Sequence, residues 1–262
     1  MEFFDTHAHY NDEKFDIDRE EIINNIYYEG ITKTVCVGYN LEKSKDAIKI
    51  AEKYDFIYAT CGISPNDIED YTDENLKIIE EISKNKKVVA IGEIGLDYYW
   101  NKENKEKQKE LFIKQIEIAN RLSKPIVIHN RDAVMDTLQI LKSNPVEKKG
   151  IFHCCPLNPE LIKEGLKLGF YISFSGNITF KNAKSYDAVS IVPMDKILIE
   201  TDSPYLTPEP FRGKRNSPSN VKLVAQKIAE IKKYSLEEVS LKTYQNAERV
   251  YNLDSIKSNF EK

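Results

Sequence analysis

The chain has 262 residues and a formal net charge of −4 at pH 7, with 41% hydrophobic and 31% charged side chains. Such a length suits one large α/β domain or two small ones, and the composition is ordinary for a globular protein. The net negative charge argues against a surface that binds nucleic acid everywhere, although a local basic loop is compatible with it. The sequence shows neither a leader pattern nor the roughly 18 consecutive apolar residues of a membrane span, so we expect a cytoplasmic protein.

Strand-like and helix-like segments alternate along the chain. Short apolar runs that are typical of strands begin near Phe3, Lys33, Phe56, Val88, Pro125, Gly150, Phe170 and Lys196. Between them, apolar residues at helical spacing predict helices over 18–29, 42–54, 73–84, 105–122, 132–141, 159–168, 181–192 and 217–232. Asp18 and the pair Ser217-Pro218 stand where helix caps are expected. Residues 235–251 predict one or two further helices.

Eight strands, each followed by a helix, favour a (β/α)8 TIM barrel with extra C-terminal helices. We therefore expect one hydrolase barrel domain over residues 1–262. The alternative is an open, doubly wound α/β sheet. The polar residues at the strand ends decide between these folds, because the ends of strands one, four, five, six and eight meet at one place only in a closed barrel.

Six potential metal ligands stand at the ends of five predicted strands. A single histidine at such a position is more often a residue of the core or of a helix cap than a metal ligand. Their joint placement at strand ends instead predicts a metal site in the barrel mouth. The six residues are His7, His9, Glu93, His129, His153 and Asp202.

The spacing of these residues predicts a site for two ions. His7 and His9 present two imidazoles to one ion, while His129 and His153 would complete the coordination of the other. Glu93 can bridge both ions with its two oxygens. Asp202 can hold a metal-bound water or accept its proton, so Glu93 and Asp202 are the catalytic candidates. Strand alternation also places Asp5 on the face of the first two histidines, and Glu200 on that of Asp202.

The four cysteines predict reduced thiols rather than disulfides. Cys36 and Cys61 lie inside apolar strand runs, Cys154 and Cys155 are adjacent, and the chain has no CxxC spacing. A thiolate ligand directly after His153 is the less favoured alternative.

Several segments together resemble the TatD family of metal-dependent deoxyribonucleases. The resemblance runs in order from residue 3 to about residue 251, and its most specific motifs are GEIGLD at 92–97 and ETD at 200–202. The other matching segments are 5–9, 125–129, 152–154 and 176–183, together with the continuation of the ETD motif to residue 208.

The resemblance implies a barrel of the amidohydrolase superfamily, two divalent cations and hydrolysis of phosphodiester bonds in DNA. It implies the same six ligands, with Glu93 at a position where related amidohydrolases often use a carboxylated lysine. The imidazoles suit zinc, iron or nickel, whereas the carboxylates and a phosphate-bearing substrate suit magnesium or manganese. The resemblance favours Mg²⁺ in use. The expected partner is single-stranded DNA or a frayed DNA end, cut as by an exonuclease, with no membrane and no stable protein partner.

Other residues are candidates for the substrate or for support of the ligands. Arg212, Lys214 and Arg215 place three cations in the loop after Asp202, where they could hold a phosphate backbone or simply face solvent. Asp5, Asp97 and Glu200 could orient the ligand imidazoles, although Asp97 could equally begin a loop. The aromatic run at 98–100 could stack on a base or pack at the rim.

Two departures from the family pattern concern the substrate. Ser64 replaces the histidine of the family's Gly-x-His-Pro turn, and a serine can hydrogen-bond a phosphate but cannot carry charge. Cys154-Cys155-Pro156-Leu157 stands where the family usually has Cys-Phe-Ser-Gly, and the loss of the glycine for a proline should stiffen and reshape that loop. Two other functions remain open: an amidohydrolase acting on a small cyclic amide or ester, and a non-catalytic metal-dependent binding protein.

Overall fold

A computed structural model describes residues 1–253 of the chain. Eight parallel strands form one sheet in which each strand pairs with its neighbours in sequence, from β1 to β8. The predicted domain over 1–262 therefore includes residues 254–262, which lie outside the described part. The strands are β1 (Phe3–Ala8), β2 (Ile31–Val37), β3 (Ile57–Cys61), β4 (Val88–Asp97), β5 (Ile126–Arg131), β6 (Gly150–Phe152), β7 (Tyr171–Phe174) and β8 (Ile197–Ile199).

The first and last strands meet and close the sheet into a barrel. The amide of Asp202 donates a hydrogen bond of 2.9 Å to the carbonyl of His7, and the amide of His9 donates one of 2.8 Å to that of Ser203. The Thr6 hydroxyl also donates to the carbonyl of Ile199 at 3.0 Å. These bonds confirm the predicted barrel and exclude the open sheet.

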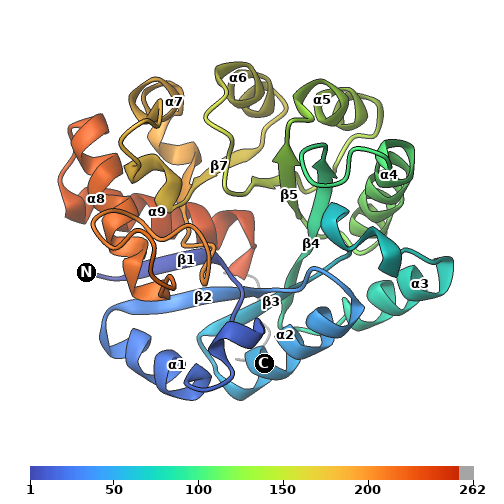
Figure 1. Ribbon diagram of the computed structural model, residues 1–262, viewed down its shortest axis with the longest axis horizontal. Coiled ribbons are helices and arrows are strands. Elements are labelled where there is room, and N and C mark those ends of the chain that lie inside the picture. Colours follow the sequence, from blue (N-terminus) through green and yellow to red (C-terminus); the bar gives the residue numbers. More distant parts are fainter. Residues whose placement is uncertain (254–262) are drawn as a thin grey trace.

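Helices surround the barrel on its outer side (Figure 1). Their ends lie close to the predicted limits, with two differences. Residues 181–192 contain a shorter helix than predicted, and Ser217 caps a short 3-10 turn (Pro218–Asn220) that leads into α8 instead of capping α8 itself. The helices are α1 (Arg19–Tyr28), α2 (Leu41–Lys53), α3 (Asp73–Ile82), α4 (Lys105–Arg121), α5 (Val134–Ser143), α6 (Pro159–Lys167), α7 (Ser185–Ile191), α8 (Val221–Lys232) and α9 (Leu236–Val250).

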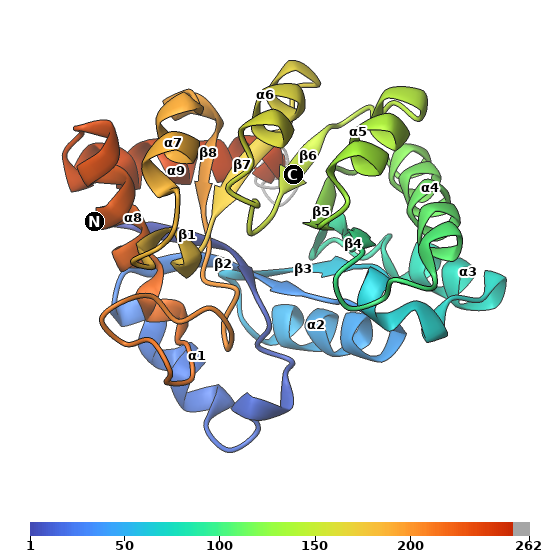
Figure 2. The ribbon, with the colours of Figure 1, turned by 45° about the horizontal axis from the view of Figure 1, so that its top comes forward.

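The inside of the barrel is packed with apolar side chains, and α9 covers one end of it. Val35, Val89 and Val127 belong to one buried cluster with Val250 and Tyr251. The Tyr251 hydroxyl donates to the carbonyl of Thr6 at 2.9 Å, which fixes the C-terminal segment to β1. Residues 235–251 thus form one helix that seals the end opposite the strand C-termini (Figure 2).

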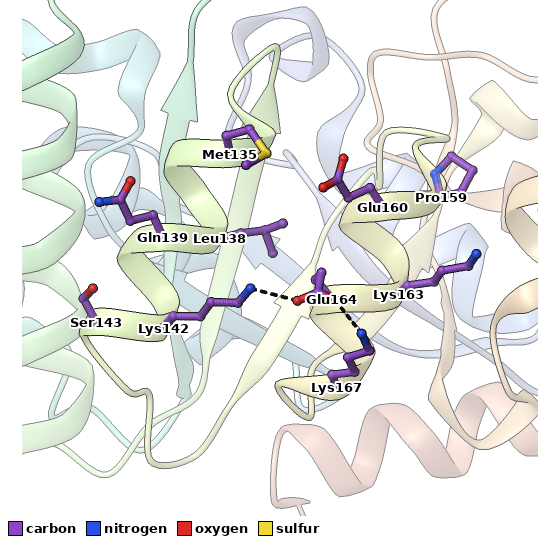
Figure 3. Close-up of a pocket in the computed structure, with 10 residues that line it drawn as sticks. All are labelled: Met135, Leu138, Gln139, Lys142, Ser143, Pro159, Glu160, Lys163, Glu164 and Lys167. Atoms are coloured by element: carbon purple, nitrogen blue, oxygen red, sulfur yellow. Dashed lines mark hydrogen bonds and ion pairs between the residues drawn. The ribbon is translucent and has the colours of Figure 1, made fainter.

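Three further observations bear on the sequence predictions. Cys36, Cys61 and Cys155 are buried and free, and Cys154 is free and partly buried. Among residues 1–253, every helix is too short or too polar to cross a membrane. A surface groove between α5 and α6 is lined by Met135, Leu138 and Lys142, among others, and lies outside the barrel (Figure 3). None of the predicted metal ligands lines this groove, so it takes no part in their chemistry.

Candidate metal centre

Glu93 occupies the middle of the predicted ligand cluster at the carboxyl ends of the strands. Its Oε2 atom lies 3.5 Å from His7 Nε2 and 3.8 Å from His9 Nε2. Its Oε1 atom lies 2.9 Å from His129 Nδ1 and 3.4 Å from His153 Nε2. Each oxygen of one carboxylate therefore faces its own pair of imidazoles.

Asp202 completes the first of these two groups. Its Oδ1 atom lies 3.2 Å from His9 Nε2 and 3.6 Å from His7 Nε2, and the two imidazole nitrogens are themselves 3.2 Å apart. Asp202 follows β8, and its amide is bonded to β1, so barrel closure places this carboxylate beside the two histidines. The structure thus brings all six predicted ligands to one place.

The spacing of the donor atoms fits divalent ions. Ligands about 2.1 Å from an ion in tetrahedral geometry lie about 3.4 Å from one another. The distances around Glu93 and Asp202 fall between 2.9 and 3.8 Å, close to that value. Two groups, His7–His9–Glu93 and Glu93–His129–His153, each offer three such atoms, and they share only Glu93. Imidazole nitrogens with carboxylate oxygens are a donor set suited to zinc, manganese, iron or nickel.

The protonation of the cluster reflects charges packed together away from water. Burial opposes ionisation of Glu93, but His153, His129 and His7 outweigh it and hold the pKa of Glu93 well below its usual range. Burial also opposes the charged form of His153, yet Glu93 and Glu200 raise the pKa of His153 well above its ordinary value. The cluster therefore retains protons on imidazole that an incoming cation must displace.

Asp97 orients one of the ligands and also holds the start of the loop after β4, so both roles that the sequence left open for it are present. Its Oδ2 atom lies 2.9 Å from His129 Nε2, which leaves Nδ1 of that ring facing Glu93. Burial opposes ionisation of Asp97, but the hydrogen bond to His129 outweighs it, and the pKa of Asp97 falls to about 2. Asn66 also donates to Oδ2, at 3.2 Å. Asn66 lies in the 3-10 turn after β3, and no motif in the sequence pointed to it.

Glu200 lies on the other side of the imidazole rings. Its Oε1 atom lies 3.3 Å from His153 Nδ1 and accepts a hydrogen bond of 2.6 Å from the amide of Cys154. The rings of His7 and His153 stack at 3.9 Å, and each of the two histidines offers a ring nitrogen within 4.8 Å of an oxygen of this carboxylate. Glu200 is thus placed where a residue that orients these imidazoles must lie.

Asp5 does not have the position that strand alternation predicted. Its Oδ1 atom accepts from the amide of Thr201 at 2.9 Å and its Oδ2 atom from the Thr201 hydroxyl at 2.6 Å. Within residues 1–253, its hydrogen bond to a ligand residue is with the backbone amide of His7, at 3.3 Å, and not with a ring nitrogen. The pairing register of β1 with β2 shifts between Asp5 and Ala8, which ends the strict alternation. Asp5 fastens β1 to the chain after β8.

The basic loop after Asp202 has one cation already paired. Arg215 forms a salt bridge with Asp18 and donates to the carbonyl of Lys14 at 2.5 Å, so it ties the loop to the segment before α1. Arg212 lies over the Phe180 ring at 3.7 Å. For Lys214 the structure shows a distance of 5.9 Å to the Phe211 ring. Contact of these three residues with a phosphate stays a prediction.

Ser64 and Cys154 have structural roles in these loops. The Ser64 hydroxyl accepts from the amide of Asn66 at 3.1 Å and caps a 3-10 turn after β3. The Cys154 sulfur lies 3.2 Å from the Ser175 hydroxyl, and burial raises the pKa of this thiol well above its ordinary value. Neither cysteine at 154–155 belongs to a ligand group among the described residues.

The chain is similar to known proteins over most of its length. A family model described as TatD related DNase matches residues 4–252. The chain is 48% identical to the uncharacterized metal-dependent hydrolase YabD of Bacillus subtilis, over 96% of this chain and 99% of the relative. It is 43% identical to the uncharacterized hydrolase YcfH of Escherichia coli, over 77% and 76% of the two chains. The crystal structure of YJJV, a TatD homologue of Escherichia coli, superposes with a TM-score of 0.91 at 26% identity, covering 95% and 98%.

Proposed function

Because the chain belongs to the TatD family of metal-dependent hydrolases, we propose that it cleaves phosphodiester bonds in DNA with two divalent cations at Glu93. His7, His9 and Asp202 would hold one cation, His129 and His153 the other. The observation that supports this most is the division of the Glu93 oxygens between two imidazole pairs. Such ions, when bound, activate water and stabilise charge on the phosphorus centre.

The protein side chains supply positioning and a proton acceptor. Burial opposes ionisation of Asp202, but its bond to His9 and the charge of His7 hold the pKa of Asp202 below its ordinary value. Asp202 is therefore ionised at neutral pH and can accept the proton of an attacking water. Asp97 and Glu200 fix ring orientations, so the imidazoles need no rearrangement when substrate arrives.

Two features favour a phosphodiester over a small cyclic amide. The bridging position is Glu93 and not a lysine, and the loop that follows Asp202 in the chain carries Arg212 and Lys214. Unpaired cations beside a metal centre suit the phosphates that flank a scissile bond. We further propose that the substrate is a single strand or a frayed end, cut from its terminus.

The test is a direct comparison of substrates. End-labelled single-stranded DNA, duplex DNA and a dihydropyrimidinase-type cyclic amide are incubated with metal-loaded protein, with and without chelator, and with the Asp202→Asn variant. We expect chelator-sensitive shortening of the single strand from one end and no turnover of the amide. Turnover of the amide alone would identify an amidohydrolase, and retention of DNA without cleavage would identify a binding protein.

A further inference from the structure

Two aromatic side chains and an arginine form an exposed cluster beside the metal centre. Tyr99 and Trp100 are 45% and 65% exposed, and their rings meet edge to face at 4.7 Å. The guanidinium of Arg131 lies 3.9 Å from the centre of the Tyr99 ring and 5.4 Å from that of Trp100. We call Tyr99, Trp100 and Arg131 the aromatic platform.

The platform is fixed to the centre through one carboxylate. Asp97 Oδ1 accepts hydrogen bonds of 2.9 Å from the amides of both Tyr99 and Trp100, while Oδ2 holds His129 at 2.9 Å. On the other side of the loop, Asn101 donates to the carbonyl of Pro65 at 3.1 Å. The backbone that bears the two rings therefore has a fixed position relative to His129, a predicted metal ligand.

The neighbouring tyrosine differs from the two platform rings in its surroundings. Tyr98 is partly buried, packs against the core, and its hydroxyl donates to Asp136 at 2.6 Å. Tyr99 and Trp100 lie beyond it, where their apolar rings remain in water. Aromatic faces beside an arginine are the surfaces on which unpaired bases stack in proteins that bind single-stranded nucleic acid.

We propose that the aromatic platform stacks an unpaired nucleobase of the strand whose phosphate lies at the metal centre. Trp100 contributes the stacking surface, and Arg131 the cation for the adjoining phosphate. The inference rests on the proposed function, and it specifies the substrate further as a strand with unstacked bases. A base inside a duplex is stacked on its neighbours and would have to leave them first, so the platform favours single strands over duplexes.

Trp100 is the only tryptophan in the chain, so its fluorescence reports on the platform directly. Metal-loaded protein is titrated with a phosphorothioate-linked single strand, which resists cleavage, and with an abasic strand of equal length and charge. We expect saturable quenching by the first strand and little by the second. Equal quenching by both would show that only backbone charge is sensed and would overturn the proposal, as would the absence of quenching by either.

The affinity of substituted proteins for single-stranded DNA tests the stacking role independently of Trp100 fluorescence. Loss of one base-stacking contact should weaken binding of the single strand by about tenfold or more in Trp100→Ala, measured by fluorescence anisotropy of a labelled strand. Trp100→Phe should retain most of the affinity. Tyr28→Ala is the matched control, since Tyr28 is an exposed tyrosine at the end of α1 that pairs edge to face with Tyr27. Equal weakening in the control, or none in Trp100→Ala, would contradict the stacking role.

Binding and cleavage results separate the two proposals. Cleavage of DNA without quenching of Trp100 would support the nuclease function and contradict the stacking role of the platform. Base-dependent quenching of Trp100 without cleavage of a cleavable strand would support the stacking role and contradict the nuclease function.

Discussion

At the scale of residues, two carboxylates organise the centre because each uses its two oxygens differently. Glu93 faces one imidazole pair with each oxygen, and Asp97 holds His129 with one oxygen and the loop at 99–100 with the other. A carboxylate with two engaged oxygens fixes the relative position of the groups that it joins. The geometry of the site therefore depends on a few acidic side chains rather than on the histidines alone.

Asp97→Asn should lower metal affinity or activity by about 10- to 100-fold, the range typical for a residue that orients a ligand. The amide cannot match the charge of the carboxylate that accepts from His129 Nε2. Elemental analysis after dialysis and steady-state hydrolysis measure the effect. Asp73→Asn, on an exposed residue paired with Lys114, is the control and should behave as the parent protein. Unchanged metal content and rate in Asp97→Asn would contradict the orienting role.

Metal binding should release protons at neutral pH. The raised pKa of His153 means that the metal-free cluster holds a proton there, and a cation can bind only the neutral imidazole. Apparent affinity should therefore rise as pH increases toward that raised pKa and fall as pH drops. Isothermal titration at neutral pH in buffers of different ionisation enthalpy should show a net release of protons on metal binding. A heat of binding that is independent of the buffer would refute this expectation.

At the scale of elements, β4 and β5 approach each other closely where the ligands emerge. Gly95 pairs with His129, and its φ of +136° is one that glycine tolerates best. A Cβ atom at Gly95 would lie 2.1 Å from the carbonyl oxygen of His129. The strand pair therefore requires glycine beside a ligand, which is the physical reason for this part of the GEIGLD motif.

Gly95→Ala should destabilise the protein by about 3 kcal/mol or more, since overpacking and backbone strain each cost about 1–3 kcal/mol. Gly213→Ala is the matched control: Gly213 also has a positive φ, of +90°, but a Cβ there would meet nothing within 4 Å. The control should lose only about 1 kcal/mol. Chemical denaturation of both variants measures the difference, and equal losses would rule out the close approach as the cause.

The loop at 208–216 carries Arg212, Lys214 and Arg215, of which Arg215 has a structural role. Arg215 is bound by Asp18, whereas within residues 1–253 the cation of Lys214 lies near the aromatic ring of Phe211. The cations of Lys214 and Arg215 therefore have different surroundings. Their contributions to a phosphate backbone should differ accordingly.

Lys214→Ala should reduce the slope of log affinity against log salt by about one if Lys214 contacts a phosphate. Arg215→Ala should mainly release the loop from Asp18, so that Asp18→Asn produces the same change in DNA binding as Arg215→Ala. Anisotropy titrations of a labelled single strand at several salt concentrations test both statements. A slope that stays the same in Lys214→Ala would show that Lys214 does not contact the backbone.

At the scale of the whole molecule, the centre exists only when the barrel is closed. The ligands come from five strands, and the two carboxylates and four imidazoles face one another in the folded state alone. Cations that bind this cluster will therefore favour the folded chain over the unfolded one.

Saturating divalent metal should raise the melting temperature, and chelation should lower it. At about 100-fold excess over the dissociation constant the gain is about 2.7 kcal/mol, or roughly 5–11 °C for a chain of this size. Differential scanning calorimetry with Mg²⁺, Mn²⁺ and Zn²⁺ measures the shift. Glu93→Gln should show a smaller shift than the parent, and equal shifts in both would place the bound metal elsewhere.

The sequence by itself determined the fold class, the order of the elements and the six residues that meet in the mouth. Hydrophobic periodicity and residue type at strand ends were sufficient, because parallel strands in a barrel all end on one face. The family could also be recognised, since the GEIGLD and ETD motifs are local and specific.

Only the tertiary structure decided which side chains meet across these elements. The register of β1 shifts, and Asp5 pairs with Thr201. Arg215 forms a salt bridge with Asp18, which is far away in the sequence. The carboxylate of Asp97 joins His129 to the aromatic platform. Each of these contacts depends on register and closure, which sequence patterns specify only through the packing of the whole barrel.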